Sequence, residues 1–300
     1  MEQIMTDSPI RFPGLFGDWA FTLSSKALNV GHGVYWYGIL IAAGMVLCGV
    51  LAIRQSKRNN FPDSLVYDVL LCGIPSAIIG ARLYYVACEW GYYSQDLRRI
   101  FDTRSGGLAV YGGVIGAFLG VFIMCKIRKI PFTSIADYCV IYIPLGQAIG
   151  RWGNFFNQEA FGTTTTLPWG MTSATVQSYL ESHCPTLVST MPVHPTFLYE
   201  SIADLAIFFL LIYVRKNSKI AFETACTYFA TYGFVRFFLE GLRTDSLYIG
   251  STGIRTSQAL SLVLVVASLI YIAIAHLKRM ERVPFPERLY EEGTKKQVNG

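Results

Sequence analysis

Long apolar segments separated by short polar ones fill most of the chain. Seven windows approach the length of about 20 apolar residues that a helix needs to cross a bilayer: 35–53, 67–88, 108–125, 134–150, 197–214, 221–240 and 257–276. The fourth window is the weakest, because Asp137 opens it and Pro144 and Gly146 interrupt it. The pattern predicts an all-α polytopic membrane protein with seven transmembrane helices.

Lysine and arginine residues are unevenly divided between the segments that connect these windows. Most of them follow the first, third, fifth and seventh windows, whereas the long segment 153–196 contains none. Basic connecting segments stay in the cytoplasm. We therefore expect an extracytoplasmic N-terminal arm over residues 1–34, a seven-helix transmembrane domain over 35–276 with an external loop at 153–196, and a cytoplasmic tail over 277–300.

The composition agrees with this class of protein. Hydrophobic residues make up 52% of the chain and charged residues 15%, with a mean hydropathy of +0.39, whereas soluble domains carry about 25% charged residues. The net charge of +5 mostly reflects the basic connecting segments, so no nucleic-acid partner is expected. The four histidines do not cluster and the seven cysteines show no paired spacing. We therefore expect neither a metal site nor another cofactor.

Three arginines lie inside apolar windows or directly after one. Arg151 follows the apolar run 141–149, and similar runs enclose Arg82 and Arg236. A charge near the bilayer interior is unfavourable, so an ionisable residue there is first considered a functional residue. Three such arginines predict a site for an anionic ligand.

Further polar residues lie near the outer ends of the windows. The segment 150–162 adds two asparagines, a glutamine and a glutamate, and its glycines predict irregular backbone that lines a cavity: Asn154, Asn157, Gln158 and Glu159, with Gly150, Gly153 and Gly162. Glu200 and Asp204 are spaced as i and i+4, so both can point into that cavity. The site is expected to open outward or sideways into lipid.

For two other groups a purely structural role is the alternative. Arg236, Glu240 and Arg243 are separated by four and then three residues and share one helix face, where an internal ion pair would neutralise Arg236 and hold the helices together. Tyr37 adjoins another tyrosine and a tryptophan, a trio that is typical of the aromatic belt at a membrane interface. Tyr111 lies between two glycine pairs, which permit close approach of a ligand or a helix.

With these motifs the chain resembles the prolipoprotein diacylglyceryl transferases of the bacterial cytoplasmic membrane. The strongest element is the segment 150–162, Gly-Arg-Trp-Gly-Asn-Phe-Phe-Asn-Gln-Glu-Ala-Phe-Gly, which is similar to the family signature. Five further blocks occur in the family's order: 35–38, 80–82, 106–113, 194–200 and 232–240. The resemblance covers nearly the whole chain.

The resemblance implies transfer of the sn-1,2-diacylglyceryl group from phosphatidylglycerol to the lipobox cysteine thiol of a prolipoprotein, with release of glycerol phosphate. The implied partners are phosphatidylglycerol, prolipoprotein signal peptides with a lipobox cysteine, and the lipid bilayer of the cytoplasmic (inner) membrane, with the active site toward the outer leaflet. The residues carried over are, for catalysis, Arg236, Tyr111, Asn154, Glu159 and Tyr37, and, for phosphatidylglycerol binding, Arg151, Arg236, Gly162 and Glu240. Arginine suits this role because its planar fork matches phosphate oxygens.

Tyr111 departs from the family's pattern, in which well-studied members carry a histidine. A phenol is a poor general base near neutral pH but a serviceable hydrogen-bond donor, so the role of this position is open. Two other classes are alternatives: a small-anion transporter and a non-catalytic phospholipid-binding membrane protein. A transporter needs access from both sides, and a pure lipid binder has no evident use for the polar cluster at 154–159.

Overall fold

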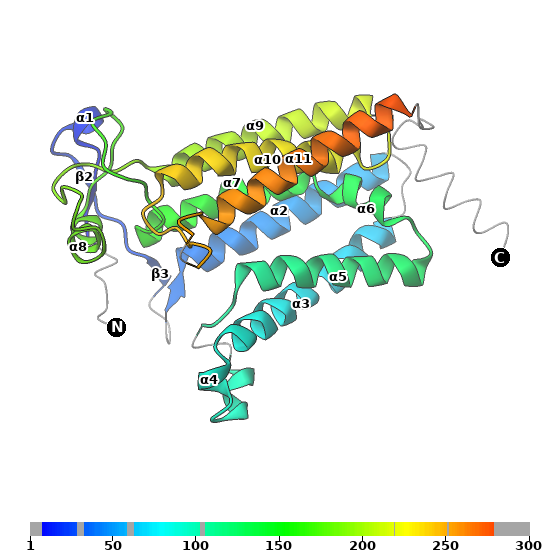
Figure 1. Cartoon of the computed structure of the whole chain (residues 1–300), viewed down its shortest axis with the longest axis horizontal. Coiled ribbons are helices and arrows are strands. Elements are labelled where there is room, and N and C mark those ends of the chain that lie inside the picture. Colours follow the sequence, from blue (N-terminus) through cyan, green and yellow to red (C-terminus); the bar gives the residue numbers. More distant parts are fainter. Residues whose placement is uncertain are drawn as a thin grey trace. The chain divides into compact units, whose positions relative to one another are not determined.

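The computed structural model describes residues 8–28, 33–58, 63–102, 106–218, 220–250 and 252–278. The described chain is mostly helical and forms two compact units, one within Met1–Cys48 and Val140–Arg282 and the other within Gly49–Cys139 (Figure 1). The first unit contains β1 (Ile10–Arg11), α1 (Pro13–Phe16), β2 (Ala20–Phe21), β3 (Lys26–Leu28), β4 (Val34–Tyr35), the start of α2 (Trp36–Arg58), α7 (Tyr142–Asn157), α8 (Ala174–His183), α9 (Thr196–Asn217), α10 (Glu223–Leu242) and α11 (Thr256–Leu277). The second contains the end of α2 with α3 (Asp63–Cys88), α4 (Trp90–Tyr93), η1 (Leu97–Phe101), α5 (Val110–Arg128) and α6 (Phe132–Cys139).

Within the described residues, five helices are long and apolar enough to cross a membrane: α2, α3, α5, α9 and α11. The short helices α6 and α7 meet at an angle of 43° and together meet the same criteria, which makes up to six spans. These helices confirm a multi-pass, all-α membrane protein. The window at 221–240 forms α10, which is not among the five because Arg236, Glu240 and several tyrosines and threonines make it more polar.

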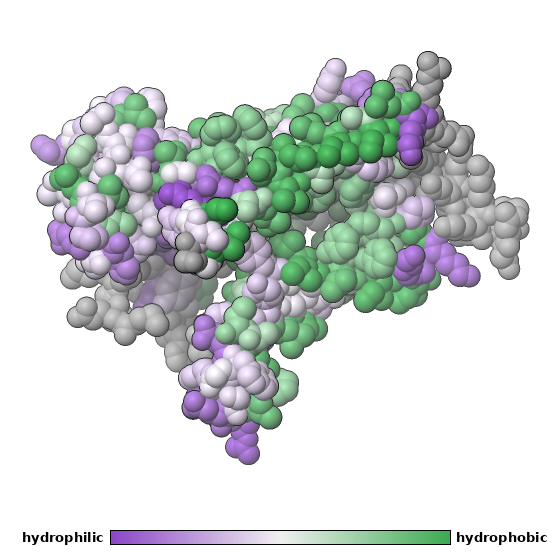
Figure 2. Space-filling model, viewed as in Figure 1, coloured by the Kyte–Doolittle hydropathy of each residue, from purple (hydrophilic) through white to green (hydrophobic). Residues whose placement is uncertain are grey.

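In the first unit, α9 packs against both α7 and α10, and α10 packs against α11 (Figure 1). Hydrophobic residues cover the visible faces of α9 and α11, as Figure 2 shows, which is the pattern of a lipid-facing surface. A glycine allows the contact of α10 with α11, since a Cβ at Gly233 would lie 3.0 Å from the Ser261 carbonyl oxygen. Polar residues of α9 and α10 are buried within this bundle, among them Glu200, Asp204 and Glu240.

The helix α7 continues through the signature segment to Asn157, and irregular backbone begins only at Gln158. The turn expected at Gly150 and Gly153 is therefore not observed. Gly153 instead provides room for a neighbouring ring, because a Cβ there would lie 2.3 Å from Cδ2 of Tyr37. The Trp36 ring also stacks on the ring of Phe156 in α7. These two contacts hold the start of α2 against the signature helix.

The segment after α7 has a hydrophobic core of its own. Buried side chains from the N-terminal arm, the end of α7, the loop, α8 and the start of α9 form this core: Ile10, Phe155, Phe161, Met171, Val176, Leu180, Val193 and Phe197. The arm pairs with the loop through backbone hydrogen bonds between Arg11 and Thr172 at 2.8 and 2.9 Å. The predicted boundaries at residues 34 and 276 stay predictions, and the predicted tail from residue 279 onward lies outside the described residues.

In the second unit, α3 and α5 touch backbone to backbone. A Cβ at Gly116 would lie 2.2 Å from the Ser76 carbonyl oxygen, and one at Gly112 would lie 2.4 Å from the Gly80 carbonyl oxygen. Together with Gly120, these glycines repeat every fourth residue along one face of α5, as small residues do where membrane helices pack closely.

Arg82 lies in the last turns of α3 and is buried. Its five N–H groups all donate to backbone carbonyl oxygens at 2.6–2.9 Å, those of Arg99, Ile100, Asp102, Gly106 and Gly107. The guanidinium thus fixes the backbone of η1 and also that of Gly106 and Gly107. The anion-binding role expected for this arginine is not supported, because its donors are already used.

The contact of α3 with α5 predicts that alanine lowers stability at one glycine of α5 and not at another glycine three residues away. Gly116→Ala should lower the melting temperature of the purified protein by several degrees, because overpacking of a tight contact costs about 1–3 kcal/mol. Gly113→Ala is the matched control, since its added Cβ would meet only ordinary contacts at 3.6 Å. Equal melting temperatures for the two variants would contradict the close approach.

Candidate functional site

Two arginines from different helices share one carboxylate inside the first unit. Nη2 of Arg151, on α7, lies 2.7 Å from Oε1 of Glu200, and Nη1 of Arg236, on α10, lies 3.5 Å from its Oε2. Glu200 lies in the first turns of α9 and is 3% exposed in its side chain. The arginine expected from the signature and the one expected from the sixth window therefore belong to the same site.

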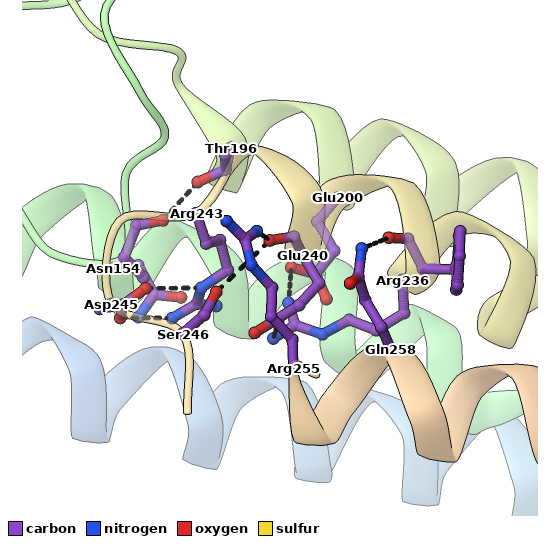
Figure 3. A network of polar contacts seen from close by, with 12 residues as sticks. Asn154, Thr196, Glu200, Arg236, Glu240, Arg243, Asp245, Ser246, Arg255 and Gln258 are labelled. Atoms are coloured by element: carbon purple, nitrogen blue, oxygen red, sulfur yellow. Dashed lines mark hydrogen bonds and ion pairs between the residues drawn. The ribbon is translucent and has the colours of Figure 1, made fainter. Parts of the chain in front are cut away.

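Arg236 has a second acidic partner on its own helix. Its Nη2 lies 2.6 Å from Oε2 of Glu240, one turn further along α10. This is the internal ion pair considered from the spacing alone, and it holds Arg236 in place beside Glu200. Arg243 does not join it, because it lies past the end of the helix and binds Asp245 with two nitrogens at 2.6 and 2.8 Å (Figure 3).

Arg243 favours the ionised form of the Asp245 carboxyl. Burial by itself would raise the pKa of the Asp245 carboxyl, but the hydrogen bond and charge of Arg243 outweigh burial and lower it below its ordinary value. Asp245 is therefore ionised near neutral pH and satisfies Arg243. Arg151 and Arg236 are therefore the two guanidiniums that face Glu200.

Arg255 supports the same helix end from α11. Its Nη1 donates to the backbone carbonyl oxygen of Glu240, and the Gln258 side chain donates to that of Phe237 at 3.0 Å (Figure 3). Sequence reasoning did not single out Arg255, because it lies at a helix start among residues that form no motif. These bonds position the end of α10 and hence the carboxylate of Glu240.

The asparagines of the signature are arranged around Glu159. Asn154 and Asn157 both donate side-chain hydrogen bonds to Oε1 of Glu159, at 3.0 and 3.2 Å, and Nη1 of Arg151 lies 3.5 Å from Oδ1 of Asn154. A continuous polar path thus joins Glu159 to Arg151. Gln158 does not take part: it caps α7 in the left-handed conformation and its buried side chain donates to the Ser8 carbonyl oxygen at 2.8 Å.

Gly162 lies where three segments of backbone meet. Its N–H donates to the His194 carbonyl oxygen at 2.9 Å, and it forms a bridge with Arg243. A Cβ there would lie 2.8 Å from the Cβ of His194, so only glycine fits without a shift. Gly162 therefore shapes the backbone next to the site.

Burial lowers the pKa of the neighbouring His194, so this histidine is neutral near pH 7.

Comparison with known proteins identifies the family. The family described as "Prolipoprotein diacylglyceryl transferase" matches residues 25–274 of this chain. Proteins named phosphatidylglycerol–prolipoprotein diacylglyceryl transferase are similar to it: one from Finegoldia magna is 46% identical over 241 residues, 80% of this chain and 90% of the relative. A second, from Clostridioides difficile, is 44% identical over 251 residues, 84% and 92% of the two chains. The chain belongs to the prolipoprotein diacylglyceryl transferase family.

The two predicted tyrosines of the family site, Tyr37 and Tyr111, lie in different compact units. Tyr37 lies in the first turn of α2 with its ring against Gly153, next to the helix that carries Arg151. Tyr111 lies in the first turn of α5, in the second compact unit, so its relation to the arginines stays a prediction.

Among the described residues, no three histidine, cysteine or acidic side chains gather as metal ligands would.

Proposed function

We propose that this chain transfers the sn-1,2-diacylglyceryl group of phosphatidylglycerol to the lipobox cysteine thiol of prolipoproteins, the first step of lipoprotein maturation. The observation that carries the proposal is the meeting of Arg151 and Arg236 on one buried carboxylate. Both arginines come from segments that resemble family motifs, and the site they form fits an anionic headgroup. The names of the relatives give the substrate class.

The proposed reaction explains why arginines are needed. The thiolate sulfur of the prolipoprotein forms a bond to the glyceryl carbon, the bond from this carbon to the phosphate oxygen breaks, and its electron pair stays on the departing glycerol phosphate. Negative charge therefore grows on a phosphate oxygen. A guanidinium held in a site of low dielectric constant stabilises such charge strongly.

Binding of the headgroup is an exchange of anions. Both arginines are already paired with carboxylates, so a phosphate must replace a carboxylate oxygen of Glu200. Arg151 is the more accessible partner, with 23% of its side chain exposed against 16% for Arg236. We assign Arg151 to the first contact with the phosphate, and Arg236, held by Glu240, to the charge that develops as the bond breaks.

The thiol proton needs an acceptor, because the thiolate is the reactive form of cysteine. Glu159 fits this role: its carboxylate carries hydrogen bonds from Asn154 and Asn157 and connects to Arg151 through Asn154. The chain needs no nucleophile of its own, because the substrate supplies it. Gly162 and Tyr37 contribute shape, the first through backbone contacts and the second through its ring against α7.

The test is incubation of the purified protein with phosphatidylglycerol labelled in its acyl chains and a synthetic lipobox peptide. Transfer of label to the peptide, and no transfer to a peptide with serine in place of the cysteine, is expected. Binding of the lipid without transfer would favour the non-catalytic phospholipid-binding alternative. A small-anion transporter would instead carry labelled phosphate across vesicles.

We further propose seven spans, with α10 as the additional one, an extracytoplasmic N-terminus, a cytoplasmic C-terminus and a site toward the outer leaflet of the inner membrane. The distribution of lysine and arginine supports this orientation. A reporter inserted after Val188, an exposed residue of the external loop, should be accessible from outside the cell. A reporter at the C-terminus should be accessible only from the cytoplasm, and the reverse pattern would refute the orientation.

Arg151→Ala should reduce transfer at least 10²-fold, the loss typical of a group that stabilises developing charge. Arg151→Lys should recover only part of this activity, because an ammonium does not form the two-point contact of a guanidinium. Arg11→Ala, on the N-terminal arm, is the matched control and should keep wild-type turnover. Near-normal turnover of Arg151→Ala would make Arg151 a structural member of the ion-pair network.

Tyr111→Phe should reduce transfer about 10²-fold if the hydroxyl binds the headgroup or relays a proton. Tyr111→His should stay active, since histidine occupies this position in relatives that the chain resembles. The rates of both variants, with phosphatidylglycerol and peptide varied separately, decide the role. A fully active Tyr111→Phe would make this ring a packing residue and would leave Glu159 as the first proton acceptor to test.

A further inference from the structure

Asp204 is a buried carboxyl that the proposed reaction does not use. It lies on α9, one helical turn after Glu200, and it is fully buried, with 0% of its surface exposed. Neither of its carboxyl oxygens has a hydrogen-bond partner among the described residues. An ionised carboxylate without a donor is very unfavourable in such a place, whereas a protonated one is far less so.

Charged and titratable groups from three helices face Asp204. They are Glu200 on its own helix, Arg151 on α7, and Arg236, Tyr228 and Tyr232 on α10. Tyr232 donates to Glu200 at 3.3 Å, and Tyr228 donates to Gln147 at 3.0 Å. Both phenols therefore direct their protons to other acceptors and leave Asp204 without a donor.

The charge of the site depends on Asp204. The two guanidiniums of Arg151 and Arg236 and the two carboxylates of Glu200 and Glu240 cancel. Arg255 adds one further guanidinium beside Glu240. An ionised Asp204 would cancel this remaining positive charge, and the site would attract the phosphodiester that it has to bind less strongly.

We propose that Asp204 is a positioning residue that holds a proton before the lipid binds, so that the arginine network keeps its positive charge and accepts one anionic headgroup. The inference rests on the proposed function, because it takes this network to be the headgroup site. Asp204 acts through the network and does not touch the lipid. When a phosphate displaces Glu200 from Arg151, the neutral Asp204 adds no repulsion, and its O–H is a donor within the same helical turn as the displaced carboxylate.

The test measures binding and not turnover. The dissociation constant of dioctanoyl phosphatidylglycerol is measured by microscale thermophoresis between pH 6 and pH 9, a range in which the phosphodiester keeps its charge. The wild type, Asp204→Asn and Ser201→Ala are compared. Ser201 is the matched control, because it is buried on the same helix and its hydroxyl donates to the Ala148 carbonyl oxygen at 2.9 Å without carrying a charge.

In the wild type, the dissociation constant should rise about tenfold as pH increases, the effect of one additional unit charge roughly 10 Å away at an effective dielectric constant of about 20. Asp204→Asn cannot ionise, so its dissociation constant should stay within about twofold over the range. Ser201→Ala should follow the wild type. Dioctanoylglycerol, which lacks the phosphate, should bind all three proteins without dependence on pH.

Two results would overturn the proposal: a pH dependence that is the same in Asp204→Asn as in the wild type, and a flat profile in both. If Asp204→Asn does not accumulate in the membrane, Asp204→Ser replaces it and should give the same flat profile. Failure of the proposed function is distinguishable, because it appears as absent transfer to the lipobox peptide while the binding profiles are still measured.

Discussion

The shared carboxylate of Glu200 is the interaction on which the site depends. Two guanidiniums inside a bundle of membrane helices repel each other and lose hydration, and one buried carboxylate between them offsets both effects. Breaking such a pair leaves an uncompensated charge at a cost of about 3–5 kcal/mol. The same charges therefore hold α7, α9 and α10 together, so a substitution at one of them changes helix packing as well as the site.

This arrangement makes the site complete without a ligand. The partners of Arg236 are fixed on two sides, by Glu200 and by Glu240, whose own backbone carbonyl accepts from Arg255. A preorganised site needs little rearrangement when charge develops in the reaction. Any anion that binds these guanidiniums has to compete with the carboxylates, which offsets part of its interaction energy.

Sequence alone predicted the class of fold and the pairing of Arg236 with Glu240, but not the relations between helices. Apolar windows predict spans because bilayer thickness fixes helix length, and the spacing of Arg236 and Glu240 predicts their pairing because one helix turn fixes it. The pairing of Arg151 with Glu200 depends on the register of α7 against α9, which no local spacing encodes. Likewise, the sequence predicts that Arg82 binds a ligand, and only the structure reveals that its donors bind backbone carbonyl oxygens.

The core formed by the N-terminal arm and α8 has a consequence for biogenesis. Ser8 contacts both Gln158 and Thr175, so its partners lie 150 and 167 residues away in the sequence. The arm precedes these partners in the chain, and the core around its hydrophobic residue Ile10 is complete only once Phe197 has been synthesised. This part of the molecule therefore folds late during membrane insertion. Before it folds, the arm and the loop that packs against it have to be on the same side of the membrane.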